Sequence, residues 1–212
     1  MENSGKLIVI EGVDGAGTTT QSGYIYNRLK EQGYKVHKTA QPSSFEPGKF
    51  IREILQKKIM NTKGKNPGSK VMSLLFAADR AYQQDEEIIP MLQNGTHVIC
   101  DRYVHSSVIY QSVSFGNLDE MEWIKMLNRH IKKPDLVIYL KIDSQVSAGR
   151  RTVRGGEAEM FETAEFQQRL IEQYNRIDEI FPDEKIITLD AGLGINQLGD
   201  AALAEIVRIL NI

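Results

Sequence analysis

Apolar residues are distributed along this chain in two alternating patterns. Short runs rich in β-branched residues occur at residues 7–10, 34–38, 97–100, 136–140 and 185–189. Between them lie longer segments, such as residues 21–32, where apolar side chains recur at helical spacing. The short runs predict buried strands, and the longer segments predict helices. Their alternation predicts an α/β fold, with a five-stranded parallel sheet and helices on both faces.

The ends of these segments support the same assignment. Gly33 and Gly95 each follow a helical pattern and precede a strand, where a left-handed helix terminus is expected. Asp143 and Ser144 follow the fourth strand and precede a helical pattern, as N-cap residues do. The chain has no internal repeat, so we expect a single domain over residues 1–212.

Composition narrows the class of protein. Of the 212 residues, 41% are hydrophobic and 25% are charged, which is ordinary for a globular protein. The formal net charge of −2 offers no general attraction to nucleic acid or to an anionic membrane, and we expect neither as a partner. Lysines do gather between residues 57 and 65, but they alternate with loop-forming residues, which indicates a solvated loop.

The cysteine content and the apolar runs bear on metal chemistry and location. Cys100 is the single cysteine, which excludes an internal disulfide and a cysteine-based metal site, and its apolar neighbours predict a core position. The first residues lack the apolar segment of a secretory signal. No apolar run approaches the ~20 residues that span a bilayer. We therefore expect a cytoplasmic protein.

Ligands of a parallel α/β sheet bind beyond the carboxyl ends of its strands, so the segment after the first strand is a candidate site. Gly12 and Gly17 have the P-loop spacing, in which backbone N–H groups and the following helix N-terminus bind a phosphate. Thr19 occupies the position whose hydroxyl holds Mg²⁺. Thr18, however, stands where the pattern has lysine. Taken alone, the segment is also compatible with a Gly-rich turn that binds no ligand.

A second candidate site follows the third strand. Asp101 and Arg102 emerge at its carboxyl end. An aspartate at this place can reach a Mg²⁺ ion, and an arginine can bind a phosphate through two parallel hydrogen bonds. A surface pair between the two residues is the alternative interpretation.

Further motifs follow in order along the chain. They are Leu74-Leu75-Phe76-Ala77-Ala78-Asp79-Arg80, Asp101-Arg102-Tyr103 with Ser106, Ser107, Tyr110 and Gln111, Lys133-Pro134-Asp135, and Arg150, Arg151 and Arg154 before Gly155, Phe161 and Tyr174. With the phosphate loop, they resemble the thymidylate kinase family over nearly the whole chain. The resemblance implies a three-layer P-loop NTPase fold, a short lid at about residues 150–161, and a homodimer.

The resemblance also implies roles for individual residues. ATP would be bound by Gly12, Val13, Asp14, Gly15, Ala16, Gly17, Thr18, Thr19 and Thr20. Mg²⁺ would be held by Thr19 and Asp101. The catalytic residues would be Asp14, Arg102, Arg150 and Arg154. The acceptor would be bound by Gln41, Phe76, Arg80, Arg102, Ser107, Tyr110 and Gln111.

Within the acceptor set, each residue would meet a different part of the nucleotide. Phe76 would stack on a pyrimidine ring, Arg80 would bond a base carbonyl and Ser107 would lie near the base edge. Arg102 would hold the acceptor phosphate. Tyr110 would stand against the sugar, where a 2′-hydroxyl would otherwise project. Without the family context, a phenylalanine at helical spacing like Phe76 is more often a core residue than a ligand contact, and Tyr110 could equally be a packing residue.

The chain departs from the family pattern at two places. Thr18 replaces the loop lysine, and Thr39-Ala40-Gln41-Pro42 stands where the family usually has Thr-Arg-Glu-Pro. The family carries its catalytic arginine either in the phosphate loop or in the lid. Here the loop has Gly15 and Ala16, so the resemblance assigns that arginine to the lid.

These observations predict an ATP-dependent nucleoside monophosphate kinase that uses Mg²⁺ to phosphorylate dTMP. Catalysis would rest on positioning and on charge neutralisation by backbone amides, metal and arginines. Ala40 and Gln41 leave open another pyrimidine monophosphate as the acceptor. Thr18 leaves open a catalytically impaired nucleotide-binding module.

Overall fold

The central sheet has five parallel strands. The computed structural model describes residues 4–116, 118–154 and 163–210, the side chains of residues 118 and 151–154 excepted. The strands are β1 (Leu7–Glu11), β2 (Val36–Ala40), β3 (His97–Asp101), β4 (Leu136–Lys141) and β5 (Ile186–Asp190). Their order in the sheet is β2-β3-β1-β4-β5, so β1 is central and pairs with β3 and β4.

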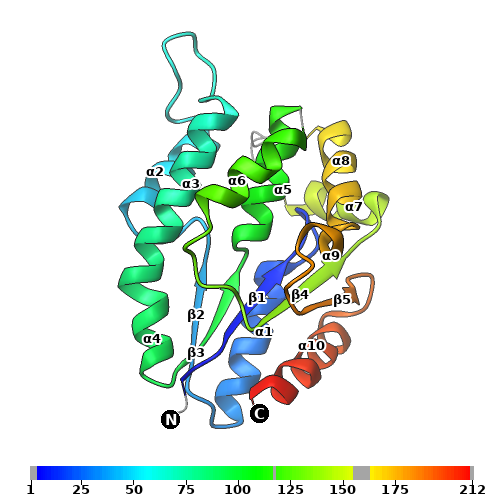
Figure 1. Ribbon diagram of the computed structural model, residues 1–212. Helices are drawn as coiled ribbons and strands as arrows, with labels where there is room; N and C mark the ends of the chain where they lie inside the picture. Colours follow the sequence, from blue (N-terminus) through cyan, green and yellow to red (C-terminus); the bar gives the residue numbers. More distant parts are fainter. Residues whose placement is uncertain (1–3, 117, 155–162, 211–212) are drawn as a thin grey trace.

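Helices connect the strands and cover the sheet (Figure 1). They are α1 (Thr18–Glu31), α2 (Glu46–Leu55), α3 (Ser69–Gln83), the π-helical turn η1 (Gln84–Ile88), α4 (Ile89–Gln93), α5 (Val104–Phe115), the 3₁₀ turn η2 (Leu118–Glu120), α6 (Met121–Leu127), α7 (Ser144–Arg154), α8 (Ala164–Tyr174), α9 (Ile177–Ile180) and α10 (Ile195–Leu210). Among the described residues, none of these helices has both the length and the apolar character to span a bilayer.

Alternate residues of β1 belong to two different hydrophobic clusters, as expected for a sheet buried on both faces. Ile8 packs in a cluster that includes Ile25 of α1. Leu7 and Val9 pack in another that includes Ile88 at the end of η1. The predicted α/β class, with helices on both faces, is therefore confirmed. Cys100 is fully buried, also as predicted.

Each predicted strand occurs within two residues of its expected position. The largest difference is at β2, which begins at Val36 and not at residue 34. Gly33 has a φ of 85°, and the backbone N–H of Tyr34 donates to the carbonyl of Leu29. Tyr34 therefore completes the end of α1 before the strand can begin. At its other end, α1 starts at Thr18, three residues before the expected position, because its first turn is polar and belongs to the phosphate loop.

Candidate active site

The segment between β1 and α1 wraps the N-terminus of α1. Gly15 and Gly17 have φ angles of 87° and 93°, which residues with a Cβ adopt only at a cost. A Cβ on Gly15 would also lie 2.7 Å from the carbonyl oxygen of Ser147. No side chain caps the first amides of α1 among the described residues, so these N–H groups face the cleft and suit an anion. Thr18, at the lysine position, is buried with 6% of its surface exposed.

The predicted Mg²⁺ ligands meet across this cleft. The Thr19 hydroxyl donates to Oδ2 of Asp101 over 2.6 Å. Oδ1 of Asp101 is buried and has no hydrogen-bond partner among the described residues. An orphaned carboxylate oxygen beside a hydroxyl is the donor set that an oxygen-seeking cation needs when phosphates complete its shell. The residues present therefore fit Mg²⁺. In the described part of the chain, no group of three or more acidic, histidine or cysteine side chains is arranged to hold a metal ion.

Arg102 occupies a conformation that few residues with a side chain adopt, with a φ of 67°. Its guanidinium forms an ion pair with Asp14 at 2.5 Å and lies 5.0 Å from the centre of the Tyr110 ring. Asp14 is also contacted by the side-chain amide of Gln167, at 3.3 Å. Backbone strain of this kind is found mainly where the surrounding structure holds a functional side chain in place.

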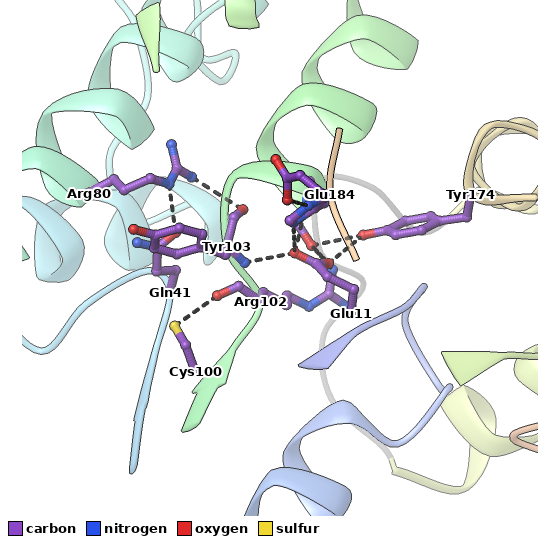
Figure 2. A network of polar contacts seen from close by, with 10 residues as sticks. Glu11, Gln41, Arg80, Cys100, Arg102, Tyr103, Tyr174 and Glu184 are labelled. Carbon is purple, nitrogen blue, oxygen red and sulfur yellow. Dashed lines mark hydrogen bonds and ion pairs between the residues drawn. The ribbon is translucent and has the colours of Figure 1, made fainter. Parts of the chain in front are cut away.

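A buried carboxylate at the end of β1 holds the chain that follows Arg102 (Figure 2). Glu11 is fully buried and accepts hydrogen bonds from the backbone N–H of Tyr103, at 2.8 Å, and from the hydroxyls of Ser106 and Tyr174. His105 lies between Glu11 and Glu184, at 3.5 and 2.8 Å. Four segments distant in sequence thus converge behind Arg102.

Glu11 and His105 each stabilise the charged form of the other. Burial alone would raise the pKa of Glu11, but His105, Ser106 and Arg102 lower it to about 2. Burial alone would lower the pKa of His105, but the two carboxylates raise it to about 9. At neutral pH, Glu11 is therefore ionised and His105 is protonated, which is the arrangement that fixes the backbone after Arg102.

A cavity of about 170 Å³ lies on the other side of Asp14 and Arg102. Its lining contains all seven predicted acceptor residues, Gln41, Phe76, Arg80, Arg102, Ser107, Tyr110 and Gln111. The Ser107 hydroxyl and Oε1 of Gln111 are buried and have no hydrogen-bond partner among the described residues. A buried polar atom without a partner in the protein is a candidate contact for a ligand. Phe76 lines the cavity and also packs against the cluster around Met72, so it can contact a ligand and contribute to the core.

Arg80 is almost completely buried, with 1% of its surface exposed. Its guanidinium donates to Oε1 of Gln41 at 2.9 Å, to Oδ1 of Asn128, and to the carbonyl of Tyr103 at 3.4 Å. All three acceptors are neutral. Burial lowers the pKa of Arg80, although nearby Tyr103 and Asp79 oppose this effect. The pocket therefore contains a buried positive charge that no carboxylate within hydrogen-bonding distance neutralises among the described residues.

Arg150 is a further cation at the cleft around the phosphate loop, among the residues that the structure describes. Arg150 of α7 lines it together with Gly15, Thr18 and Thr19. Arg154 ends α7, and its side chain lies outside the described residues, as do those of Arg151 and most of the predicted lid at about residues 150–161. The predicted N-cap of α7 is present, because Oδ1 of Asp143 accepts from the backbone N–H of Gln145.

Asp14 and Arg102 line both cavities and so stand where the cleft and the acceptor pocket meet. The structure brings the described predicted residues to one of these two cavities, with three exceptions. Asp101 is bonded to Thr19, and Gly12 and Ala16 are buried in the loop and line neither cavity. The structure adds supporting residues that the sequence did not indicate, namely Glu11, Gln83, Asn128, His105 and Gln167. Of these residues, only Glu11 had a recognisable signal in the sequence, because it is a charged residue at the end of an otherwise apolar strand.

Comparison with known proteins gives a consistent result. The family model described as thymidylate kinase matches residues 10–201. A probable thymidylate kinase of Pyrococcus abyssi is 34% identical over 189 residues, covering 89% of this chain and 90% of that protein. One of Thermococcus kodakarensis is 38% identical over 188 residues, with coverage of 85% and 88%. A thymidylate kinase of Shouchella clausii is 31% identical over 210 residues, with coverage of 97% and 96%.

Proposed function

The chain belongs to the thymidylate kinase family, and on that premise we propose that it transfers the γ-phosphoryl group of ATP to dTMP, giving dTDP and ADP. One observation supports the site most strongly. The ion pair of Asp14 and Arg102 borders both the phosphate-loop cleft and the acceptor pocket. A group placed there can contact the phosphates of donor and acceptor at once, which phosphoryl transfer requires.

The reaction is a direct displacement. An oxygen of the acceptor phosphate forms a bond to the γ-phosphorus while the bond from that phosphorus to the β,γ-bridging oxygen breaks, and ADP leaves with the electron pair. Arg102 holds the acceptor phosphate, and Asp14 orients Arg102 through their ion pair. The amides between Gly12 and Thr20 hold the donor phosphates. Thr19 and Asp101 would hold Mg²⁺, which would supply positive charge to the donor phosphates.

Because the phosphate loop has no lysine, another cation has to supply positive charge beside the donor phosphates. Arg150 is the described arginine of the predicted lid, and it lines the cleft beside Thr18. We assign it the charge that the lysine otherwise supplies, together with Arg154 on closure of a lid at about residues 150–161. With such a cation, the enzyme can be active although Thr18 stands at the lysine position.

Base selectivity comes from one donor, Arg80, and one acceptor, Gln111. Arg80 only donates hydrogen bonds, so it matches a base carbonyl and opposes an amino group. Oε1 of Gln111 lines the same pocket and suits a ring N–H. These contacts favour thymine or uracil over cytosine. Tyr110, 6% exposed, stands against the sugar and disfavours a 2′-hydroxyl.

The proposal includes a cytoplasmic homodimer of one-domain subunits. One face of α3 exposes Val71, Leu74 and Tyr82, at 47%, 51% and 46% of their surfaces. These residues recur at helical spacing, and α3 lies at the outer edge of the fold in Figure 1. An apolar stripe on one helix suits a symmetric contact with a second copy.

A coupled ADP-release assay across pyrimidine monophosphates tests this function. With ATP and Mg²⁺, dTMP should have a kcat/KM at least about tenfold above that of UMP or CMP, which corresponds to about 1.4 kcal/mol. Tyr110→Ala should narrow the gap between dTMP and its ribonucleotide, whereas Tyr110→Phe should preserve it. Equal turnover of UMP would remove the assignment. A chain that binds no ATP and phosphorylates none of these acceptors would be the impaired binding module.

A further inference from the structure

Behind the acceptor pocket, four side chains form a continuous line of hydrogen bonds. Nε2 of Gln83 donates to Oε2 of Glu87 at 2.9 Å. Oε1 of Gln83 accepts from Nε2 of Gln41 at 3.0 Å. Oε1 of Gln41 accepts from Arg80 at 2.9 Å, the bond drawn in Figure 2. Gln83 is fully buried and Gln41 is 8% exposed, so water does not replace these partners.

The two ends of the line determine the direction of every bond in it. An ionised carboxylate only accepts and a guanidinium only donates, whereas an amide can do either from its two ends. Glu87 therefore takes the NH₂ end of Gln83, which leaves the oxygen of Gln83 for Gln41. Gln41 in turn presents its NH₂ to Gln83 and its oxygen to Arg80. Only one orientation of the two amides satisfies all four groups.

Glu87 is held as an acceptor from other sides as well. His37 lies 2.7 Å from Oε1 of Glu87, and the Thr39 hydroxyl donates to its Oε2 at 2.8 Å. Burial alone would raise the pKa of Glu87, but bonds from His37, Gln83 and Thr39 lower it below its ordinary value. The carboxylate end of the line is therefore anchored to β2, next to the segment that carries Gln41.

This direction requires a neutral amide at position 41. A carboxylate there would face the oxygen of Gln83 at about the same distance, and two acceptors would repel each other. If Gln83 turned over, its oxygen would instead face Glu87. Gln41, which stands where the family pattern usually has glutamate, is thus matched to Gln83 and Glu87. Because Gln41 is neutral, Arg80 keeps its full charge toward the pocket.

We propose that Gln83 and Glu87 set the acceptor specificity of this kinase, by orienting Gln41 so that Arg80 faces the base as an unneutralised donor. The inference rests on the proposed function in one respect, that the acceptor base contacts Arg80. Gln83 and Glu87 are positioning residues, since they act through Gln41. They select an oxo group at the base edge over an amino group.

The orientation of Gln83 can be reversed by moving the negative charge from position 87 to position 41. Gln41→Glu alone should raise the KM for dTMP about tenfold and reduce the preference for dTMP over dCMP, while the KM for ATP changes less than about twofold. Adding Glu87→Gln allows Gln83 to donate to Glu at position 41 and to accept from Gln at position 87. The double variant should recover a dTMP KM within about threefold of the native value.

Controls separate this coupling from general damage. Glu86→Gln, at an exposed neighbouring acid, should not rescue Gln41→Glu. Gln83→Met cuts the line without adding a charge, and should raise the dTMP KM by about threefold or more even if Gln41→Glu folds poorly. The melting temperatures of the native chain, Gln41→Glu, Glu87→Gln and the double variant give the same double-mutant cycle without any acceptor present.

Two results would overturn the inference. One is a Gln41→Glu variant with native KM and native preference for dTMP over dCMP. The other is a double variant whose KM and melting temperature equal the combined effects of the single changes. Failure of the proposed function looks different, because the native chain would then bind no dTMP in calorimetry while the melting temperatures still showed coupling.

Discussion

The two ends of the proposed site are built in different ways. The donor end is made of backbone amides from the loop between β1 and α1, with exposed side chains such as Thr19 and Arg150 around an open cleft. The acceptor end is made of buried side chains, and Arg80, Gln83 and Tyr103 have 1%, 0% and 1% of their surfaces exposed. The first end depends on local chain geometry, and the second depends on contacts between distant segments.

This difference explains how the two departures from the family pattern are accommodated. Thr18 is compatible with a loop in which Gly15 and Gly17 adopt left-handed conformations, and a cation can approach the cleft from outside. Gln41, by contrast, lies in a line of hydrogen bonds that includes Gln83 and Glu87, so it cannot change alone. We therefore expect donor-end changes to alter rate, and acceptor-end changes to alter stability as well.

Thr19→Ala gives the largest expected effect and tests the donor end. Removing the hydroxyl that meets Asp101 should lower kcat about 10²–10³-fold at saturating ATP, by weakening Mg²⁺ placement. Because Thr19 is exposed, the melting temperature should stay within about 2 °C of the native value. Steady-state kinetics over a range of Mg²⁺ concentrations, beside a thermal melt, measure both. Thr62→Ala, in the exposed loop before α3, is the control.

The opposite outcome would contradict the expectation that changes at the donor end alter the rate and leave the stability unchanged. A Thr19→Ala protein that melts far below the native chain but turns over normally would mean that the loop hydroxyl is structural.

His105→Gln tests the acceptor end, where we expect a loss of stability. Removing one member of a buried ion pair should cost about 3 kcal/mol, or roughly 6–12 °C in Tm. The folded pKa of about 9 exceeds the ordinary 6.5, so His105 stabilises the fold fully below pH 6.5 and loses this contribution as pH rises through 9. Native Tm should therefore fall between pH 7 and pH 10 more steeply than that of the variant.

The control for this change is His130→Gln, since His130 is exposed and lies outside the network. Equal pH slopes for the native chain and the His105 variant would show that the charge of His105 does not contribute, and that Glu11 is held by the other bonds alone.

The donor end could be predicted from sequence because its signal is local. Gly12, Gly17 and Thr19 lie within a single turn, and Asp101 is the last residue of β3. Parallel strands align their carboxyl ends, so Asp101 had to arrive near Thr19. The fold was predictable for a similar reason. The spacing of apolar residues indicates each strand and helix, and the position of glycines indicates where each helix ends.

The support behind the acceptor pocket could not be predicted in this way. Arg80 bonds Gln41 and Asn128 at separations of 39 and 48 residues, and Glu11 bonds the amide of Tyr103 at a separation of 92. Polar residues such as Gln83 and Asn128 give no periodic signal that separates a buried network from an exposed helix face. Only the packing of α3 against β2 and α6 shows which of them are partners.

The central claim is that a lid-side arginine supplies the charge missing at Thr18. The direct measurement is the kcat for dTMP of four proteins, the native chain, Thr18→Lys, Arg150→Ala and the double variant, with Arg176→Ala as a surface control. Arg150→Ala should lower kcat about 10²-fold with little change in the dTMP KM, and Thr18→Lys should then restore at least about tenfold, although it changes the native enzyme less than about threefold. Native turnover by Arg150→Ala, or the same effect of Thr18→Lys in both backgrounds, would contradict the claim.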